Sequence, residues 1–223
     1  MTVFLLDRLE KLSEKDLASF YPKLSLQRRE KVDSLRFLPD KTASACAYLL
    51  LRLLLKKERE IIDAPEFGFL EEKKPFILGR EDIFFSLSHD RAGVGVALSD
   101  KPVGIDVQAV FHYEEMLAER ILSEKERAVF DPNKPDEELF TQFWTMKESL
   151  GKKGGEGVMP HLKSTDFSGV KGGGVYRYGG DVFTVGKSGE VFYSVCASSA
   201  AEIKVLSSEE FFKEVALLTD AHI

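Results

Sequence analysis

Residues 83–108, IFFSLSHDRAGVGVALSDKPVGIDVQ, contain three candidate β-strands in close succession. Residues 83–88 and 103–107 are short, mainly apolar segments, and residues 94–98 alternate between larger apolar and small side chains, as strands do. The residues between these segments include Asp, Gly, Lys and Pro, which favour tight turns. Short strands joined by tight turns predict an antiparallel meander.

Candidate helices lie on both sides of this stretch. Residues 26–36 have the composition of a charged helix, and the leucines within residues 41–59 recur at helical spacing. Asp40 is the expected cap of this second helix. Downstream, residues 137–152 form another long candidate helix, which ends at a glycine-rich segment.

The end of the chain repeats this order. Three further candidate strands with glycine-containing turns lie within residues 175–197, and a last candidate helix covers residues 208–218. Helices followed by a meander, twice, predict an α+β protein of two similar halves, residues 1–100 and 101–223. In each half, helices should pack on a small antiparallel sheet, and a site is expected in the cleft between the halves.

Composition narrows the possible classes of partner. The 223 residues carry 31 basic and 37 acidic side chains, a net charge of −6, which argues against a nucleic-acid partner. The longest apolar run, residues 43–55, contains Arg52 and is too short to span a bilayer, so no membrane partner is expected. The N-terminus lacks the features of a secretion signal. The sequence therefore predicts a cytoplasmic protein.

Two polar side chains interrupt the third strand. Asp106 and Gln108 share one face of it, because alternate side chains of a strand point the same way. The simpler interpretation is an edge strand whose acid faces water. If the acid is buried, it requires a partner or a metal, and two oxygens on one face would suit Mg²⁺.

The segment FWTMKESLGK, residues 143–152, supplies a second acid. Glu148 and Lys152 lie one helical turn apart on one stripe, whereas Lys147 falls near the phenylalanines of the apolar side. Taken alone, Glu148 and Lys152 are typical of an ordinary surface pair. Their position beside the single tryptophan and before a glycine-rich stop is also compatible with the edge of a cleft.

Several other kinds of site are disfavoured by spacing. His89 has no second His or Cys at ligand spacing, which argues against zinc. Residues 151–157, GKKGGEG, follow a helix and lack the residue order of a P-loop. No Gly-x-Ser-x-Gly elbow indicates a serine hydrolase.

Combined, VGID at 103–106 and FWTMKESLGK at 143–152 resemble the paired motifs of the 4′-phosphopantetheinyl transferases, with Glu148 42 positions after Asp106. This family moves the 4′-phosphopantetheine arm of coenzyme A onto a serine of an apo acyl or peptidyl carrier protein. The other product is adenosine 3′,5′-bisphosphate. The resemblance therefore implies a transferase of fatty-acid, polyketide or nonribosomal peptide synthesis, with coenzyme A as substrate and Mg²⁺, or else Mn²⁺, as cofactor.

Three upstream segments extend the resemblance. SLSH at 86–89 resembles a Ser-His element of the family, and EKKP at 72–75 resembles a Gly-Lys-Pro element with Lys73 in place of Gly. RREK at 28–31 resembles a basic segment that helps to hold coenzyme A. The predicted duplication is similar to that of the larger, monomeric Sfp-type members, which implies a monomer with coenzyme A between two α+β halves.

The resemblance also implies roles for single residues. Asp106 and Glu148, with Gln108, would hold the metal, and Glu148 would also be the base for the incoming serine. Lys152 would neutralise phosphate charge as the leaving group forms. The implied contacts with coenzyme A are Arg28, Lys31, Lys41, Lys74, Pro75, Ser88, His89, Lys147 and Lys152.

Two departures leave alternatives open. Gln108 stands where many relatives carry a second acid, and a neutral amide is a weaker magnesium ligand, so a lower metal affinity is expected. Lys41 stands slightly before the basic residue of many relatives. A catalytically weak or inactive relative that binds coenzyme A or a carrier protein is therefore the alternative. Unrelated to the family, the chain could be an interaction module whose Lys-Glu-Lys helix is a solvated face.

Overall fold

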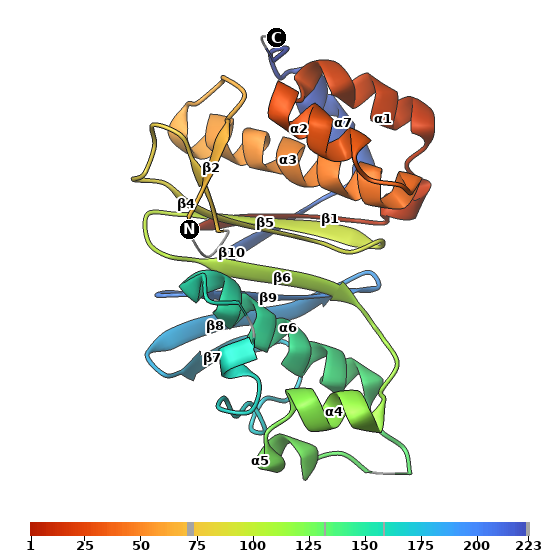
Figure 1. Cartoon of the computed structure of the whole chain (residues 1–223), viewed down its shortest axis with the longest axis vertical. Helices are drawn as coiled ribbons and strands as arrows, with labels where there is room; N and C mark the ends of the chain where they lie inside the picture. Colours follow the sequence, from red (N-terminus) through yellow and green to blue (C-terminus); the bar gives the residue numbers. More distant parts are fainter. Residues whose placement is uncertain (71–73, 132, 158, 222–223) are drawn as a thin grey trace.

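The computed structural model describes residues 1–221 except 71–73, 132 and 158. It confirms an α+β fold, in which two four-stranded sheets lie against each other and helices cover the outer side of each (Figure 1). An apolar cluster fills the space between the sheets. Its members include Val3, Leu5 and Ala97 from the first sheet and Ile105, Val107 and Val195 from the second.

The first sheet has the strand order β10-β1-β5-β4, with β1 and β10 parallel and the other pairs antiparallel. Its strands are β1 (Thr2–Asp7), β4 (Phe84–His89), β5 (Gly93–Ser99) and β10 (Glu202–Leu206). Its helices are α1 (Glu14–Phe20), α2 (Leu26–Asp33), α3 (Leu38–Arg59) and α7 (Ser208–Ala216), with short 3₁₀ turns at Leu9–Lys11 and Tyr21–Lys23.

The second sheet has the order β6-β9-β8-β7 and is antiparallel throughout. Its strands are β6 (Gly104–Ala109), β7 (Gly174–Tyr178), β8 (Asp181–Ser188) and β9 (Val191–Ala197). Its helices are α4 (Glu115–Ile121), α5 (Glu124–Arg127) and α6 (Glu137–Gly154), with a 3₁₀ turn at Met159–His161. A separate hairpin pairs β2 (Phe67–Phe69) with β3 (Pro75–Ile77).

Helix α3 covers the first sheet as its leucine spacing predicts, and Leu49, Leu50 and Leu54 are fully buried. The prediction that this helix begins after Asp40 is wrong. It begins at Leu38 after the N-cap Phe37, and its first turn contains a proline. Proline suits a first turn because its fixed φ is helical and its missing N–H has no partner there. None of the described helices is long and apolar enough to cross a membrane.

The predicted three-stranded meander is also wrong in one respect. Strands β4 and β5 pair as expected, but β6 pairs with β9 of the second sheet. The outer N–H groups of β6 instead donate to serine hydroxyls of β4: Ile105 N to Ser86 Oγ at 3.1 Å and Val107 N to Ser88 Oγ at 3.2 Å. Side chains thus bond the edge of β6 to β4, so the two sheets meet without a backbone ladder at this seam.

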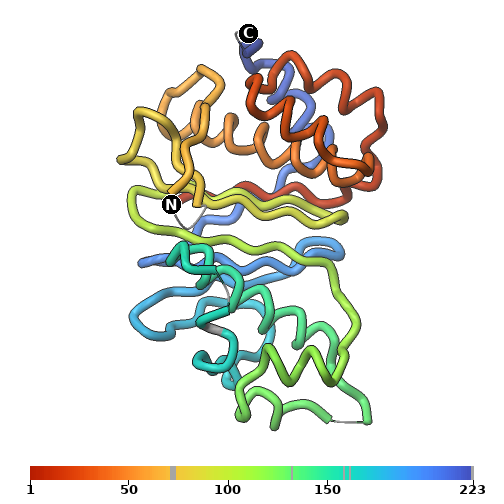
Figure 2. Tube along the Cα trace, viewed as in Figure 1, coloured from red at the N-terminus to blue at the C-terminus, as the bar shows by residue number. Residues whose placement is uncertain are grey.

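The C-terminal segment returns to the first sheet. Figure 2 shows the chain end beside the N-terminal helices, and β10 runs parallel to β1. The division into residues 1–100 and 101–223 stays a prediction. It suits the strands that form each sheet, except that β10 and α7 belong with the first layer.

Candidate functional site

The site begins with a close contact between α6 and β6. A Cβ atom at Gly104 would lie 2.0 Å from the carbonyl oxygen of Ser149 and 2.5 Å from the backbone nitrogen of Lys153. Only glycine permits this approach. The hydroxyl of Ser149 also lies 2.9 Å from that of Ser194 on β9. The contact holds the C-terminal half of α6 against the face of β6 that carries Asp106.

Asp106 is the centre of the resulting cluster. Its side chain is buried, with the residue 5% exposed. The Oδ1 atom accepts hydrogen bonds from Lys152 Nζ at 2.6 Å and from Ser88 Oγ at 2.8 Å. Lys152 also donates to Ser88 at 2.9 Å. Residues from β4, β6 and α6 therefore meet at one point beside the seam between the sheets.

The second carboxylate oxygen of Asp106 distinguishes its contact with Lys152 from an ion pair in which every polar atom has a partner. Oδ2 is buried and has no hydrogen-bond partner among the described residues. Burial raises the pKa of Asp106, although the nearby Lys152 opposes that shift. A buried acceptor without a partner is costly, which indicates a position for a proton, a water or a cation.

Glu148 lies one turn before Lys152 on α6 and is half-buried. Burial raises its pKa, and the negative charge of Asp106 raises it further, while Lys152 lowers it. Such mutual effects require the two carboxylates to lie within electrostatic range of each other. Two acids and one lysine therefore share this corner, as the paired motifs predict.

Gln108 continues the same face of β6. Its Nε2 donates to Asp90 Oδ2 at 2.7 Å, and Asp90 Oδ1 accepts from Ala92 N at 3.0 Å. Asp90 is not predictable as a site residue from the sequence, because an acid in a turn after a strand usually serves only the turn. The only available signal was its position next to His89.

His89 is the last residue of β4 and is exposed. Its pKa is lowered first by partial burial and then by the positive charges of Lys152 and Arg28, while Asp40 raises it. These effects place the start of α3 and a side chain of α2 near the same strand end. The structure thus gathers positive charge next to the acid cluster.

Arg28 on α2 has a half-buried guanidinium. It lies 5.2 Å from the ring centroid of Tyr48 and 5.5 Å from that of Phe67, and it donates to Ser44 Oγ at 3.2 Å. No acid of the described residues forms an ion pair with it, and burial lowers its pKa. A half-buried, stacked cation that forms no ion pair with an acid is suited to an anionic ligand. Lys31 is exposed one turn further along α2.

Lys41 and Lys74 approach from other elements. Lys41 is half-buried in the first turn of α3, next to Asp40. Lys74 donates through Nζ to the carbonyl of Lys153 at 2.7 Å, and burial lowers its pKa. Lys74, Pro75 and Lys152 line one pocket, so the hairpin segment and α6 face a common space. Lys73 lies outside the described residues.

Helix α6 ends beside this pocket at a position whose backbone conformation favours glycine. Gly155 has φ 89°, the left-handed conformation that closes a helix, and its N–H donates to the carbonyl of Gly151 at 2.9 Å. A Cβ at Gly155 would lie 3.5 Å from the Lys74 side chain. The glycine-rich stop read in the sequence is therefore a helix cap beside the pocket.

Lys147 is not brought to this cluster, which corrects the implied phosphate contact. Its side chain is fully buried on the opposite side of α6, with Nζ 2.9 Å from Glu126 Oε2. It also donates to the carbonyls of Leu162 and Thr165 and to the Thr165 hydroxyl. Burial lowers its pKa, and Glu126 opposes that shift.

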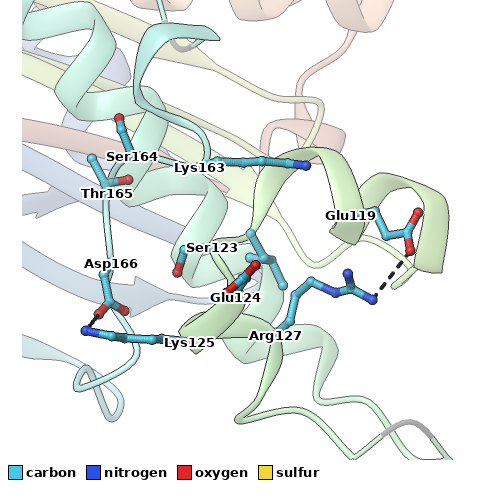
Figure 3. Close-up of a pocket in the computed structure, with 10 residues that line it drawn as sticks. Glu119, Ser123, Glu124, Lys125, Arg127, Lys163, Ser164, Thr165 and Asp166 are labelled. Atoms are coloured by element: carbon cyan, nitrogen blue, oxygen red, sulfur yellow. Dashed lines mark ion pairs between the residues drawn. The ribbon is translucent and has the colours of Figure 1, made fainter.

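The surface near this buried pair is a separate polar pocket (Figure 3). Residues of α4, α5 and the segment 163–166 line it, and none of them is a predicted site residue. Lys125 lies 3.5 Å from Asp166, and Arg127 lies 3.5 Å from Glu119. Opposite charges on its rim neutralise one another, so this pocket lacks the excess of one sign that a charged ligand needs.

The residues of the cluster fit a magnesium ion bound together with phosphates. No group of three or more His, Cys, Asp or Glu that could hold a metal occurs in the described part of the chain. Magnesium is, however, commonly held by one or two carboxylates while substrate phosphates and waters complete its shell. Asp106, with its unpartnered Oδ2, and Glu148 supply two such carboxylates.

Comparison with known proteins connects this geometry to a family. Residues 102–198 match the model of the 4′-phosphopantetheinyl transferase superfamily. A "4′-phosphopantetheinyl transferase" of Bacillus subtilis is 29% identical over 144 residues, which are 63% of this chain and 64% of that protein. The transferase psf-1 of Bacillus pumilus is 28% identical over 159 residues, 70% of this chain and 68% of psf-1. Over about two thirds of its length, the chain is similar to 4′-phosphopantetheinyl transferases.

A third relative, the 4′-phosphopantetheinyl transferase gsp of Aneurinibacillus migulanus, is 31% identical over 119 residues, which are 52% of this chain and 47% of gsp. The matches thus span about half to two thirds of these transferases. The segment that fits the superfamily model contains Asp106, Gln108, Glu148 and Lys152. The other predicted contacts, except Lys147, precede it. The paired motifs therefore lie in the part of the chain that identifies the superfamily.

Proposed function

We propose that this chain transfers the 4′-phosphopantetheine arm of coenzyme A to a serine of an apo acyl or peptidyl carrier protein. One observation carries the proposal. The two superfamily motifs meet at Asp106: Lys152 donates to its Oδ1 atom, its charge raises the pKa of Glu148, and its buried Oδ2 atom has no partner among the described residues. Coenzyme A and the carrier are the two substrates, and Mg²⁺, replaceable by Mn²⁺, is the cofactor.

The reaction is a displacement at phosphorus. The serine Oγ forms a bond to the β-phosphorus of coenzyme A, and the bond from that phosphorus to the bridging oxygen breaks. The electron pair leaves with adenosine 3′,5′-bisphosphate, and the serine proton goes to a base. Because the reacting pyrophosphate is anionic, positioning and charge neutralisation provide most of the catalysis.

The roles follow from position and charge. Asp106 and Glu148, with Gln108 beside them, would hold the metal ion, which when bound neutralises pyrophosphate charge. Glu148 accepts the serine proton, for which its raised pKa is favourable. Lys152 stabilises the charge that develops on the leaving group, and Asp106 and Ser88 hold its ammonium in place.

The remaining contacts would hold the nucleotide end of coenzyme A. Arg28 and Lys31 face the 3′-phosphate, with the stacked guanidinium of Arg28 as the stronger site. His89 contacts a phosphate, and Lys74 and Pro75 line the adenine in the pocket that they share with Lys152. Lys41 contributes charge from the start of α3. Lys147 is left out, since its ammonium is buried elsewhere.

The test mixes the protein with an apo carrier, coenzyme A and Mg²⁺ and reads the intact mass of the carrier. One fatty-acid carrier, one polyketide carrier and one peptidyl carrier should be compared, because the proposal covers all three. Addition of phosphopantetheine to any of them supports the proposal. Binding of coenzyme A without transfer to any carrier supports the alternative of an inactive relative. If the protein neither binds coenzyme A nor modifies any carrier, both the proposal and the alternative are overturned.

The proposal also covers the cellular location and the oligomeric state of the protein. We propose a monomer that acts in the cytoplasm, where coenzyme A and carrier proteins meet. Neither a nucleic acid nor a membrane has a role in the reaction. Sedimentation of the purified chain with and without coenzyme A measures the oligomeric state, and a stable dimer would contradict the monomer.

A further inference from the structure

The contact between Asp90 and Gln108 fixes the orientation of an amide. Asp90 accepts from Gln108 Nε2 at 2.7 Å through Oδ2, and its Oδ1 accepts from the backbone N–H of Ala92 at 3.0 Å. An ionised carboxylate can only accept hydrogen bonds. The amide nitrogen of Gln108 must therefore face Asp90, and its oxygen must face away.

Gln108 lies on the face of β6 that carries the site. Gln108 and Asp106 share one face of β6, because they are two residues apart along the strand. Asp106 has an oxygen on that face without a partner among the described residues. We propose that Asp90 is a positioning residue, which holds Oε1 of Gln108 available to the divalent cation bound by Asp106 and Glu148. This inference rests on the proposed function.

The contact with Asp90 also affects how well Gln108 can replace the second acid that many relatives carry at its position. Gln108 is neutral, but a carboxylate at 2.7 Å polarises its amide and increases the negative character of Oε1. Hydrogen-bond partners behind metal ligands typically change metal affinity by about 10- to 100-fold. In this proposal Asp90 orients and polarises Oε1 of Gln108. The pair thereby takes the place of a single carboxylate as a metal ligand.

The first variant, Asp90→Asn, inverts the amide while it preserves the turn. The introduced asparagine can still accept from the Ala92 N–H through its side-chain oxygen, so its NH₂ group faces Gln108. Two opposed donors force the Gln108 amide to turn, which presents Nε2 to the cation. Mn²⁺ binding, measured by electron paramagnetic resonance with coenzyme A but no carrier, should weaken about 10-fold.

The second background, Gln108→Glu, reverses the sign of the effect. The introduced carboxylate would face the Asp90 carboxylate at hydrogen-bond distance, and the two charges repel. In this background Asp90→Asn removes the repulsion and supplies a donor, so it should strengthen Mn²⁺ binding. If Asp90 acted only as a distant negative charge, Asp90→Asn would weaken binding in both backgrounds. That result, or no change in either, would overturn the proposal.

Controls separate this inference from the proposed function. Asp82→Asn changes an exposed acid at the other end of β4, where it pairs with Arg80, and should leave Mn²⁺ affinity unchanged. Asp106→Asn should abolish binding. If the unaltered protein binds Mn²⁺ and the Asp90 variants do not differ from it, only the inference fails. If the unaltered protein binds no Mn²⁺ in the presence of coenzyme A, the proposed metal site fails with it.

Folding is checked in parallel by thermal melting of each variant. If Asp90→Asn lowers the melting temperature enough to unfold the sample, Asp90→Ala is measured instead in both backgrounds. Alanine leaves the Gln108 amide free to adopt either orientation, so the expected loss of Mn²⁺ affinity is smaller. In the Gln108→Glu background Asp90→Ala should still strengthen binding. Equal weakening in both backgrounds would again overturn the proposal.

Discussion

Two of the lysine–carboxylate contacts of helix α6, those of Lys147 and Lys152, differ in almost every respect. Lys147 pairs with Glu126 in full burial, and its remaining donors reach backbone and hydroxyl oxygens. Lys152 is partly exposed beside a pocket, and the carboxylate of Asp106 keeps one oxygen without a partner in the described structure. The first pair is complete and holds the fold. The second is incomplete, which is a feature of sites that bind ligands.

Helix geometry explains why neighbours in one motif differ so much. Lys152 is five positions after Lys147, and at about 3.6 residues per turn this places the two side chains roughly 140° apart around the axis. Lys147 therefore points toward α5 and the segment that follows α6, whereas Lys152 points toward β4 and β6. A single helix thus carries a structural lysine and a lysine of the proposed site within two turns.

The largest effect is expected from Glu148→Gln, which keeps the shape of the side chain and removes its charge. Transfer should fall by about 1000-fold or more, because the base and a metal ligand are lost together. The rate of phosphopantetheine addition to a carrier, followed by mass, measures this effect. Melting temperature and coenzyme A binding should stay close to those of the unaltered protein.

Glu138→Gln is the matched control on the same helix. Glu138 is exposed and pairs with Lys187 at 2.7 Å, away from the cluster. The Glu138→Gln variant should transfer phosphopantetheine at the normal rate. A fully active Glu148→Gln would refute the assignment of Glu148 as base and ligand.

The next largest effect concerns the fully buried pair of Lys147 and Glu126. Lys147→Met leaves Glu126 as a buried charge without its cation, which should destabilise the protein by about 3 kcal/mol. Chemical denaturation measures the loss. Below the unfolding transition, transfer per folded molecule should be nearly unchanged, because the side chain does not face the proposed site. Normal stability combined with strongly reduced transfer would instead restore Lys147 as a phosphate contact.

A double variant sharpens this test. Adding Glu126→Gln to Lys147→Met removes the unpaired charge but keeps a side-chain oxygen for the Phe167 N–H, which Glu126 accepts at 2.9 Å. Part of the lost stability should return. If the double variant is no more stable than Lys147→Met, charge burial is not the cause of the loss.

The pair of Lys152 and Asp106 should show the opposite pattern, with a large loss of transfer and a small loss of stability. Lys152→Met should lower transfer by about 100-fold, because a cation that neutralises the leaving group is lost. Its cost in stability should be smaller, about 1 kcal/mol, since Lys152 is partly exposed and Asp106, with its raised pKa, can take up a proton. A stability loss as large as that of Lys147→Met, with normal transfer, would reverse the comparison.

The sequence predicted most strands and helices because their periods are local properties of the chain. The leucines of α3 and the strands within residues 175–197 are examples. It could not predict that β6 leaves the meander, because serine hydroxyls of β4 satisfy its edge and no pattern in β6 reveals its partner. The short strands β2, β3 and β10 were missed for the same reason, since they depend on distant neighbours.

The site was predicted in a similarly uneven way. Asp106, Glu148 and Lys152 could be named because two motifs carry them, and the structure brings them together. The helical period already placed Lys147 on the apolar side, and that physical argument agrees with the structure better than the motif does. Asp90 could not be found, because its role depends on an amide that it meets only in the folded chain.

The smallest predicted effect is a shift in pH dependence. Burial and the charge of Asp106 raise the pKa of Glu148 above its ordinary value of 4.5, so this group keeps its proton to a higher pH than an exposed Glu. As pH falls, the basic form is lost, and kcat/KM should decline on the acid side with a midpoint above 4.5. The profile of kcat/KM reports groups of the free enzyme.

Lys152→Met tests the cause of this shift. Lys152 lowers the pKa of Glu148, so its removal should move the acid decline to still higher pH, in the residual activity of the variant. Lys147→Met should leave the midpoint in place, because Lys147 does not contribute to that pKa. A midpoint that moves equally in both variants would mean that the two lysines act on Glu148 alike, and the contrast between the two sides of α6 would fail.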